Sequence, residues 1–438
     1  MATNQEETWS TKPIVPQDVM DTLQLSNLWS QLLYNRNIST ISQTKEFLSS
    51  STYSISPPLI TPDMGRAVTR ILKASENNET IGIYGDFDAD GITATAILFR
   101  TLSELNYKVL PYIPDRLKEG HGLNNNAIQY LSSQKVTLLI TVDCGITSIS
   151  EIDYAQSIGI DTIVTDHHMP SESLPAAYAL IEAKMPDFPK DMAELTGAGI
   201  ALKLGEAIYL AQGKDPDKSL LQLAAIGTIA DLGSLNSENR MLIKSGLHSL
   251  HLSPMLGIGE ILSITSTDPE DVNSKAISFN IAPRINAAGR LGSAAISLEL
   301  LTTNLKSDAK ELAKKLEAIN QQRRHLSQSL LIVADEQVQI QITENESLLI
   351  VSGNEFTPGM AGLIASRMVE QYKRPTVVIS TNGDKARASG RSTKEFDLIN
   401  MLDECKTLFE QFGGHKQAAG FTANKTNLLH IIESMRES

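Results

Sequence analysis

The chain has 438 residues, a formal net charge of −13, and a content of 41% hydrophobic and 20% charged residues. These values predict an ordinary globular protein of two or three domains and exclude one that holds DNA through its overall charge. Any nucleic-acid binding would therefore use a local groove or bound metal. The two cysteines form no disulfide framework, and the polar N-terminus and short apolar stretches predict a cytoplasmic protein without a membrane segment.

The first 60 residues are predicted to form an N-terminal helical segment. Residues 1–12 are polar and are expected to be disordered, whereas residues 16–48 have the spacing of short helices. The expected core residues of these helices are Trp29, Leu32 and Leu33. Prolines at 54–59 predict a linker, because proline cannot continue a helix.

From Thr61 onward, helical and strand patterns alternate. Four apolar strands are predicted at 81–84, 108–113, 136–143 and 161–168. Apolar strands separated by helices predict a parallel sheet that is buried on both faces. Residues 195–231 are predicted to form two helices, and residues 240–330 are expected to be mostly helical.

Residues 306–337 have the pattern of one long helix, charged on one side, that would connect two domains. A second α/β unit follows. Its predicted elements are a strand at 347–352, a helix at 359–372 and strands at 376–380 and 386–392. Asn382-Gly383 between the last two strands is a strong hairpin signal.

The sequence IGIYGDFDADG at 81–91 joins a predicted strand to a predicted helix through Asp86, Asp88 and Asp90. Ligands of α/β sheets bind at the carboxyl ends of the strands. Three carboxylates at one point repel each other, which lowers the stability of the fold. A bound divalent cation would remove this repulsion. An EF-hand is disfavoured, because Ile97 stands where its last Glu is needed. A solvated acidic turn remains an alternative.

Three further predicted strand ends carry the same types of side chain. Asp143 lies in TVDCG, Asp166, His167 and His168 lie in TDHH, and Asp231 lies in GTIADLG. Carboxylate and imidazole ligands without thiolate suit Mn²⁺ or Mg²⁺. A single Asp before Gly is usually a cap, and a single His is usually a packed or surface residue. Four such strand ends in one α/β unit favour a metal site.

The motif Gly197-Ala198-Gly199 could suggest a dinucleotide site. It lacks the third glycine, because Leu202 stands at that position, and it follows no clear strand. We therefore do not interpret it as a cofactor-binding motif.

GDFDADG, VDCG, TDHH and ADLG, in this order, resemble the DHH phosphoesterase superfamily. PDRLKEGHGLN, RINAAGRLG, ASGRS and GGHKQAAGF resemble its RecJ branch, the single-strand-specific exonucleases. The similarity runs from about residue 30 to 425. It implies an α/β fold with an active site between two domains joined by a long helix. The implied parts are an N-terminal segment at 1–60, a DHH domain with a parallel sheet at 61–305, a connecting helix at 306–340 and a smaller DHH-associated domain at 341–438.

The resemblance implies a site for two ions of Mn²⁺ or Mg²⁺. Asp88 and Asp90 would bind different ions, and Asp143 would bridge them. The remaining implied ligands are Asp86, His167 and Asp231. Many DHH relatives carry a His at the position of Tyr84, and Asp86 is the ligand whose role is least defined.

Two catalytic residues would act beside the ions. Asp166 would orient the ligand shell, as partners of ligating histidines do, and His168 would face the substrate phosphate. The implied substrate-binding residues come from both domains: Arg116, Arg284, Asn286, Arg290, Ser389, Arg391, Ser392, Gly413, Gly414 and His415. Arginine binds phosphate bidentately, and glycine lets backbone amides approach it closely. The alternative for these motifs is a glycine-rich turn with surface arginines.

The implied function is a metal-dependent exonuclease on single-stranded DNA, working 5′ to 3′ in repair and recombination. Many relatives continue into an oligonucleotide-binding barrel beyond the position of Ser438, so the chain is expected to act as a monomer beside an accessory single-strand-binding protein or helicase. The alternative enzyme is a phosphodiesterase on short oligonucleotides, RNA or cyclic dinucleotides. An inactive replication scaffold is a further alternative, although such relatives tend to lose ligands that this chain keeps.

Overall fold

The computed structural model describes residues 10–48, 61–116, 118–235, 237–344 and 346–437. The chain divides into two compact units, residues 1–54 and residues 55–438, and each is described by itself. The linker predicted at 54–59 and the first nine residues lie outside the described residues.

The N-terminal unit contains three short helices, as predicted: α1 (Gln17–Leu23), α2 (Asn27–Tyr34) and α3 (Ile41–Leu48). Leu33 is buried in its small core, but the prediction for Trp29 and Leu32 is wrong, since they are 53% and 38% exposed. The buried face of α2 runs through Ser30 and Leu33. Residues one position away on a helix point in a different direction, so Trp29 and Leu32 face outward.

The larger unit contains a five-stranded parallel sheet, here called sheet A. Its strands are β1 (Thr80–Gly85), β2 (Lys108–Tyr112), β3 (Val136–Val142), β4 (Asp161–Asp166) and β5 (Ala179–Glu182), in the order β2-β1-β3-β4-β5. The parallel sheet and its first four strands confirm the prediction, whereas β5 was not predicted. Because β4 ends at Asp166, His167 and His168 lie beyond the strand.

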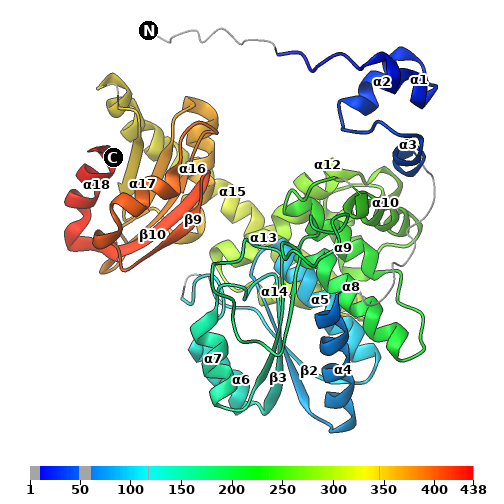
Figure 1. The fold of residues 1–438 in the computed structure, drawn as a ribbon. Helices are drawn as coiled ribbons and strands as arrows, with labels where there is room; N and C mark the ends of the chain where they lie inside the picture. The colour runs from blue at the N-terminus through cyan, green and yellow to red at the C-terminus, as the bar shows by residue number, and fades with distance from the viewer. Residues whose placement is uncertain (1–9, 49–60, 117, 236, 345, 438) are drawn as a thin grey trace. The chain divides into compact units, whose positions relative to one another are not determined.

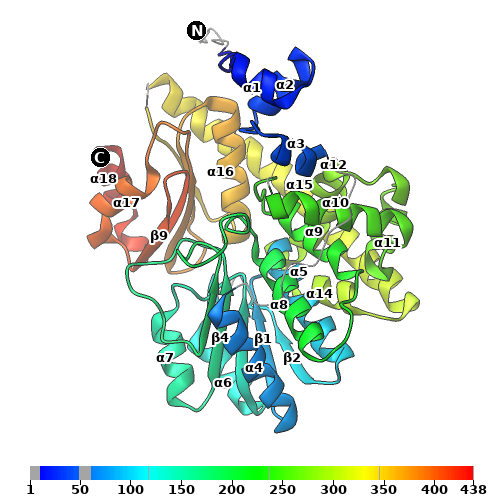
Figure 2. The same ribbon diagram turned by 45° about the vertical axis from the view of Figure 1, so that its right-hand side comes forward.

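Helices cover both faces of sheet A (Figures 1 and 2). One face carries α6 (Asn125–Ser133) and α7 (Ile149–Ser157), and the other carries α4 (Pro62–Glu76), α5 (Ala89–Glu104) and α8 (Gly197–Ala211). A helical layer follows: α9 (Leu220–Ala230), α10 (Ser237–Leu252), α11 (Leu256–Ile264), α12 (Ser274–Ala276), the π-turn η2 (Ile277–Ile281), α13 (Ala282–Leu291) and α14 (Ala295–Thr302).

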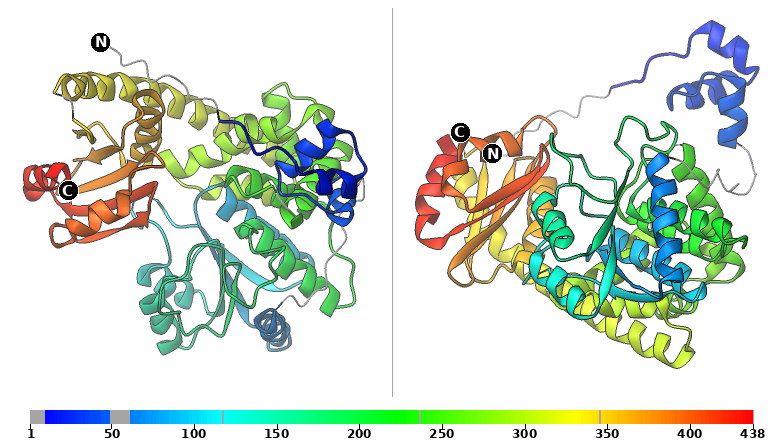
Figure 3. Two further views of the ribbon diagram at one scale, coloured as in Figure 1. Left: turned by 45° about the horizontal axis from the view of Figure 1, so that its top comes forward. Right: turned by 60° about the horizontal axis from the view of Figure 1, so that its bottom comes forward.

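The predicted connecting helix is present as α15 (Lys306–Thr343), which Figure 3 shows running from the first domain to the second. The second domain contains sheet B, in the order β6-β7-β8-β10-β9. Its elements are β6 (Leu349–Gly353), α16 (Pro358–Tyr372), β7 (Thr376–Ser380), β8 (Lys385–Arg391), α17 (Leu398–Glu404), β9 (Gln411–His415), β10 (Ala418–Asn424) and α18 (Leu428–Glu437). β7 and β8 pair antiparallel, which confirms the predicted hairpin.

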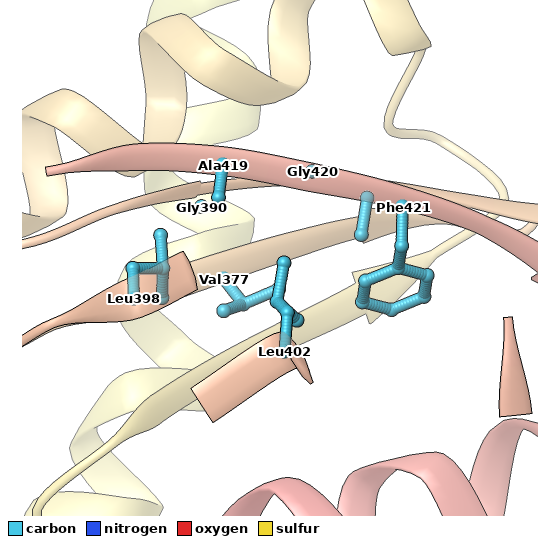
Figure 4. A pocket seen from close by; sticks show the side chains of 8 residues that line it. Val377, Gly390, Leu398, Leu402, Ala419, Gly420 and Phe421 are labelled. Atoms are coloured by element: carbon cyan, nitrogen blue, oxygen red, sulfur yellow. The ribbon is translucent and has the colours of Figure 1, made fainter. Parts of the chain in front are cut away.

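The second domain has two apolar layers. Side chains of α15 and α16 pack on one face of sheet B, and side chains of α17 and α18 pack on the other. The apolar hollow in Figure 4 lies under α17, between Leu398, Leu402 and Phe421, and it is a feature of core packing. None of the described helices is long and apolar enough to cross a membrane. The exact domain limits given above remain a prediction.

Candidate active site

The acidic turn connects β1 to α5. Asp88 caps α5, and its Oδ1 accepts hydrogen bonds from Asp90 N (3.0 Å) and Gly91 N (3.1 Å), which would otherwise have no partner at the start of a helix. A Cβ on Gly91 would lie 2.6 Å from Asp86 O. Glycine is therefore needed here because the turn folds back on itself.

Asp90 is 1% exposed, and its carboxylate is held by the start of α8. Gly197 N donates to Oδ2 at 2.7 Å, and Ala198 N donates to Oδ1 at 3.0 Å. Thr196 Oγ1 also donates to Oδ1, at 3.0 Å. The amide groups and the dipole of a helix N-terminus both favour an anion. The motif at 197–199 therefore binds a carboxylate of the protein itself, a role that was not predicted from the sequence.

Side chains that follow three other elements, β3, β4 and α9, converge beside Asp90. His167 Nε2 lies 2.9 Å from Asp143 Oδ1, 3.8 Å from Asp90 Oδ2 and 3.9 Å from Asp231 Oδ2. Asp143 adopts φ = 61°, which is uncommon for a non-glycine residue. Asp231 follows the helix α9, which confirms the two helices predicted at 195–231 and shows that the strand end predicted at Asp231 is wrong.

Three groups of side chains have potential ligand atoms within 4.8 Å of one another. The two discussed here are Asp90, His167 and Asp231, the first group, and Asp86, Asp88 and Asp143, the second; the third is Asp143, His167 and His168. The contact between Asp143 and His167 links the two groups. The Asp143 carboxylate thus lies where it could contribute ligand atoms to both groups. Oxygen and imidazole ligands of this kind fit Mn²⁺ or Mg²⁺.

The electrostatics of these groups also fit bound cations. Burial, followed by the charges of neighbouring carboxylates, raises the pKa values of Asp86 and Asp90 to about 8. The same causes raise the pKa of Asp143 well above its usual value. Asp86 Oδ1 is buried and has no hydrogen-bond partner among the described residues. A divalent cation would stabilise the ionised carboxylates and give this oxygen a partner.

Asp166 is not in either group, because its oxygens are already occupied. It accepts hydrogen bonds from Ile146 N (3.0 Å), His167 N (2.7 Å) and His168 Nδ1 (2.7 Å). Burial tends to raise the pKa of Asp166, but the hydrogen bond and charge of His168 together with the backbone hydrogen bonds outweigh it, and the pKa is lowered. The ring that Asp166 orients is thus that of His168, whereas the ring of His167 contacts Asp143.

The two histidines carry different charges at neutral pH. Burial lowers the pKa of His167 to about 4, so its imidazole is neutral, the form that binds metal. The hydrogen bond to Asp166 raises the pKa of His168 to about 9, so its ring is a cation. This charge suits a contact with phosphate better than a contact with a metal ion.

Tyr84 points away from the acidic turn. Its side chain is buried, stacks on Tyr112 and donates from Oη to Gly122 O at 2.7 Å. Tyr84 therefore supports the loop before α6 instead of supplying a ligand. This loop also carries His121, whose Nδ1 lies 3.8 Å from Asp86 Oδ2. His121 was not among the predicted site residues, although its motif PDRLKEGHGLN was one of those that carried the resemblance.

Arginines from both domains lie around the acidic groups. The guanidinium of Arg116 is 4.8 Å from the centre of the Phe87 ring, beside the acidic turn. Burial, followed by the charge of Arg116, lowers the pKa values of Arg290 (to about 10) and Arg391. Arg391 is held on β8 by Nη1 bonds to Gly390 O (2.8 Å) and Ser389 Oγ (3.2 Å). Positive groups that are held close enough to repel one another form an arrangement that an anionic ligand would stabilise.

Comparisons with known proteins agree with this geometry. Residues 80–228 match the family model "DHH family, N-terminal domain", and residues 345–438 match the DHHA1 domain. The single-stranded-DNA-specific exonuclease RecJ of Bacillus subtilis is 36% identical over 417 residues, which cover 95% of this chain and 52% of that protein. A structure of exonuclease RecJ bound to manganese matches with a TM-score of 0.77 and 30% sequence identity. The match covers 88% of this chain and 95% of that chain.

The chain belongs to the RecJ branch of the DHH superfamily. A second RecJ structure, from Thermus thermophilus in complex with Mn²⁺, matches with a TM-score of 0.82 and 29% sequence identity. This match covers 96% of this chain and 60% of the Thermus thermophilus chain. This RecJ-type chain spans about half the length of the curated relatives it matches.

Three residues expected to bind substrate have other contacts in this RecJ-type chain. Arg284 is buried, and its Nε lies 2.7 Å from Glu317 Oε2 on α15, so it is not available to a ligand. Ser392 is also buried and donates to Phe396 O at 3.1 Å. Asn286 Oδ1 accepts from Ala89 N at 2.8 Å. The sequence motifs did not show which protein groups these three side chains contact.

The remaining expected substrate residues stay predictions. Gly413, Gly414 and His415 lie on β9, an exposed edge strand of sheet B. Gly414 has φ = 136°, and a Cβ there would overlap β10, so glycine is required by the strand pairing itself.

A pocket of about 260 Å³ lies beside Asp231, and both domains line it. Its wall includes Leu232, Asn286 and Arg290 from the first domain, Arg323 from α15 and Leu363 from α16. Leu232 is 86% exposed and adopts φ = 59°. This left-handed residue ends α9 in a capping turn, in which Gly233 N donates to Thr228 O at 2.9 Å, and it leaves the Leu232 side chain on the surface beside the pocket.

Proposed function

We propose that the chain is a metal-dependent exonuclease that hydrolyses phosphodiester bonds of single-stranded DNA from the 5′ end, in DNA repair and recombination. The observation that carries the proposal is the convergence of two acidic groups with arginines from both domains. The RecJ exonucleases named above support the reaction and the substrate. Because the chain spans about half the length of such relatives, its activity and its partners are inferred.

We assign the ligand roles to Asp86, Asp88, Asp90, Asp143, His167 and Asp231. Two bound ions would activate water and neutralise charge on the phosphate oxygens. The protein's part is to hold these ligands rigidly, through the amides at the start of α8 and through the cap at Asp88. Asp166 keeps His168 protonated and oriented, so that His168 can donate a hydrogen bond to a phosphate oxygen.

Charge and shape both favour a single strand over a duplex. Arg116, Arg290 and Arg391 would bind phosphate, which allows local binding on a protein of net charge −13. Leu232 and Leu363 give the pocket apolar surfaces against which an unstacked base could lie. Bases in a duplex are stacked and paired, so they cannot make this contact without an energetic cost.

A phosphodiesterase on short oligonucleotides, RNA or cyclic dinucleotides is the second candidate. The size of the pocket, about 260 Å³, favours this alternative because it leaves room for only a small part of a strand. We further propose that the enzyme is a cytoplasmic monomer whose hold on long strands is helped by an accessory single-strand-binding protein or helicase.

The decisive experiment measures specificity constants with Mn²⁺ on single strands from two to several tens of nucleotides, in DNA and RNA, labelled at either end. The exonuclease proposal predicts release of mononucleotides from the 5′ end and a rise in kcat/KM over the first few nucleotides, followed by a plateau. Highest activity on dinucleotides, with long strands refused, would select the second candidate. Attack from the 3′ end would contradict the proposed direction.

A further inference from the structure

The helix α13 lies between the acidic turn and the second domain. At its middle, Asn286 Oδ1 accepts the backbone N–H of Ala89 at 2.8 Å. Ala89 lies between Asp88 and Asp90, which belong to the two different groups of potential ligands. A shift of this single peptide would therefore move ligands of both groups.

The backbone of α13 also packs directly on the acidic turn. A Cβ on Gly289 would lie 2.7 Å from Phe87 O, so the helix and the turn leave no room for a side chain between them. Together with the bond from Ala89 to Asn286, this gives two contacts one helical turn apart. Two such contacts fix the turn against the helix in both position and orientation.

The C-terminal end of α13 touches the second domain in an equally close way. A Cβ on Gly359, at the start of α16, would overlap Arg290 O, and Arg290 Nη1 donates to Gly359 O at 3.2 Å. Leu291 packs against the apolar cluster of the second domain that contains Phe356 and Met360. The second domain thus rests on the same short helix that supports the acidic turn.

We propose that α13 couples the position of the second domain to the geometry of the acidic turn, and that Asn286 is the positioning residue in this link. The inference rests on the proposed function, because it treats Asp88 and Asp90 as metal ligands. A helix of ten residues moves as one body, so a shift of α16 at Gly359 reaches Ala89 through Asn286. Binding of substrate phosphates to the second domain would then strengthen metal binding, and metal would strengthen substrate binding by the same factor.

The first test measures Mn²⁺ affinity of the full chain by calorimetry and by the electron paramagnetic resonance signal of free Mn²⁺. Asn286→Ala removes the acceptor for Ala89 N and is expected to weaken Mn²⁺ binding about tenfold, as losses next to the ligand shell typically do. Gly359→Ala touches no ligand and is expected to weaken it about fivefold through α13. The control is Gly259→Ala on α11, where a Cβ would be 3.8 Å from its nearest neighbour, and it should bind like the unaltered protein.

The second test adds a non-hydrolysable phosphorothioate oligothymidylate. It should tighten Mn²⁺ binding in the unaltered protein, and this gain should shrink in Gly359→Ala. Circular dichroism and thermal unfolding show whether each variant folds. If Gly359→Ala does not fold, the Mn²⁺ affinity of Asn286→Ala decides whether the inference holds. Unaltered Mn²⁺ affinity in folded Asn286→Ala would overturn the inference. Failure of the unaltered protein to bind Mn²⁺ would instead refute the proposed function.

Discussion

Gly197 donates its backbone N–H to Asp90 at 2.7 Å, and at the same time its Cα lies against Asp143. A Cβ at this position would lie 2.5 Å from Asp143 Cβ, a distance that real side chains do not adopt. One residue at the start of α8 thus fixes two acidic side chains, one in the first turn of α5 and one directly after β3. The close contact with Asp143 explains why glycine is needed at position 197, although this glycine does not belong to a cofactor-binding motif.

Gly197→Ala should therefore damage the metal site without unfolding the first domain. The added methyl group pushes Asp143 away from His167, and we expect Mn²⁺ affinity to fall by about tenfold or more. Calorimetric titration with Mn²⁺ checks this, with Gly259→Ala as the control for a glycine change inside a helix. An affinity equal to that of the control would show that Asp143 is not a ligand or that α8 gives way freely.

Asp143→Ala should abolish hydrolysis while the protein stays folded, since a bridging carboxylate serves both ions. Asp90→Ala and His167→Ala should have the same effect. The measurement is the rate of single-strand digestion after metal has been stripped and restored. Asp153→Ala, at an exposed position on α7, is the matched control. A rate for Asp143→Ala close to that of the control would remove the bridging assignment.

Arg391→Ala should raise KM for single-stranded DNA more than it lowers kcat, because Arg391 is proposed to contact phosphate away from the reacting bond. Loss of one phosphate contact should also reduce the salt dependence of binding by about one unit of slope. Binding titrations at several salt concentrations measure this. The control is Arg367→Ala, an exposed arginine on α16 that is paired with Glu370. An unchanged slope would mean that Arg391 has only a structural role.

Glu182, on β5, should make stability fall as the pH rises. Burial raises its pKa to about 8 from an ordinary value of 4.5, and its Oε2 has no hydrogen-bond partner among the described residues. Between these two values the unfolded chain is ionised while the folded chain holds the proton, so each step upward in pH favours unfolding. Above about pH 8 the folded chain is ionised as well, and the decrease in stability due to Glu182 is complete.

Glu182→Gln removes this ionisation, and we expect the variant to be about 1–3 kcal/mol more stable than the unaltered protein at pH 8. The difference should shrink towards pH 5. Urea unfolding at both pH values is the measurement, and Glu299→Gln, at an exposed position, is the control. An advantage for Glu182→Gln that is as large at pH 5 as at pH 8 would contradict the proposed cause.

The order and type of most elements, and the residues that could carry the chemistry, were predictable from local sequence patterns. Apolar runs separated by helical periods specify a parallel sheet, because both faces of such a sheet are buried. Asp86, Asp88 and Asp90 could be placed together because they lie in one turn, where spacing along the chain is also spacing in space. Asp143 and His167 follow β3 and β4, neighbouring strands whose ends must meet at one edge of the sheet.

Which side chains face the site depends on how distant elements pack together. Asp231 and Gly197 reach it from helices whose packing no local pattern fixes, since their partners lie more than fifty residues away along the chain. Arg284 and Arg290 share one motif, yet the first pairs with Glu317 on α15 and the second approaches α16. The direction of a side chain on a helix changes by about 100° per residue. What it meets there depends on elements placed by the whole fold, and this is why a motif identified the family but not each contact.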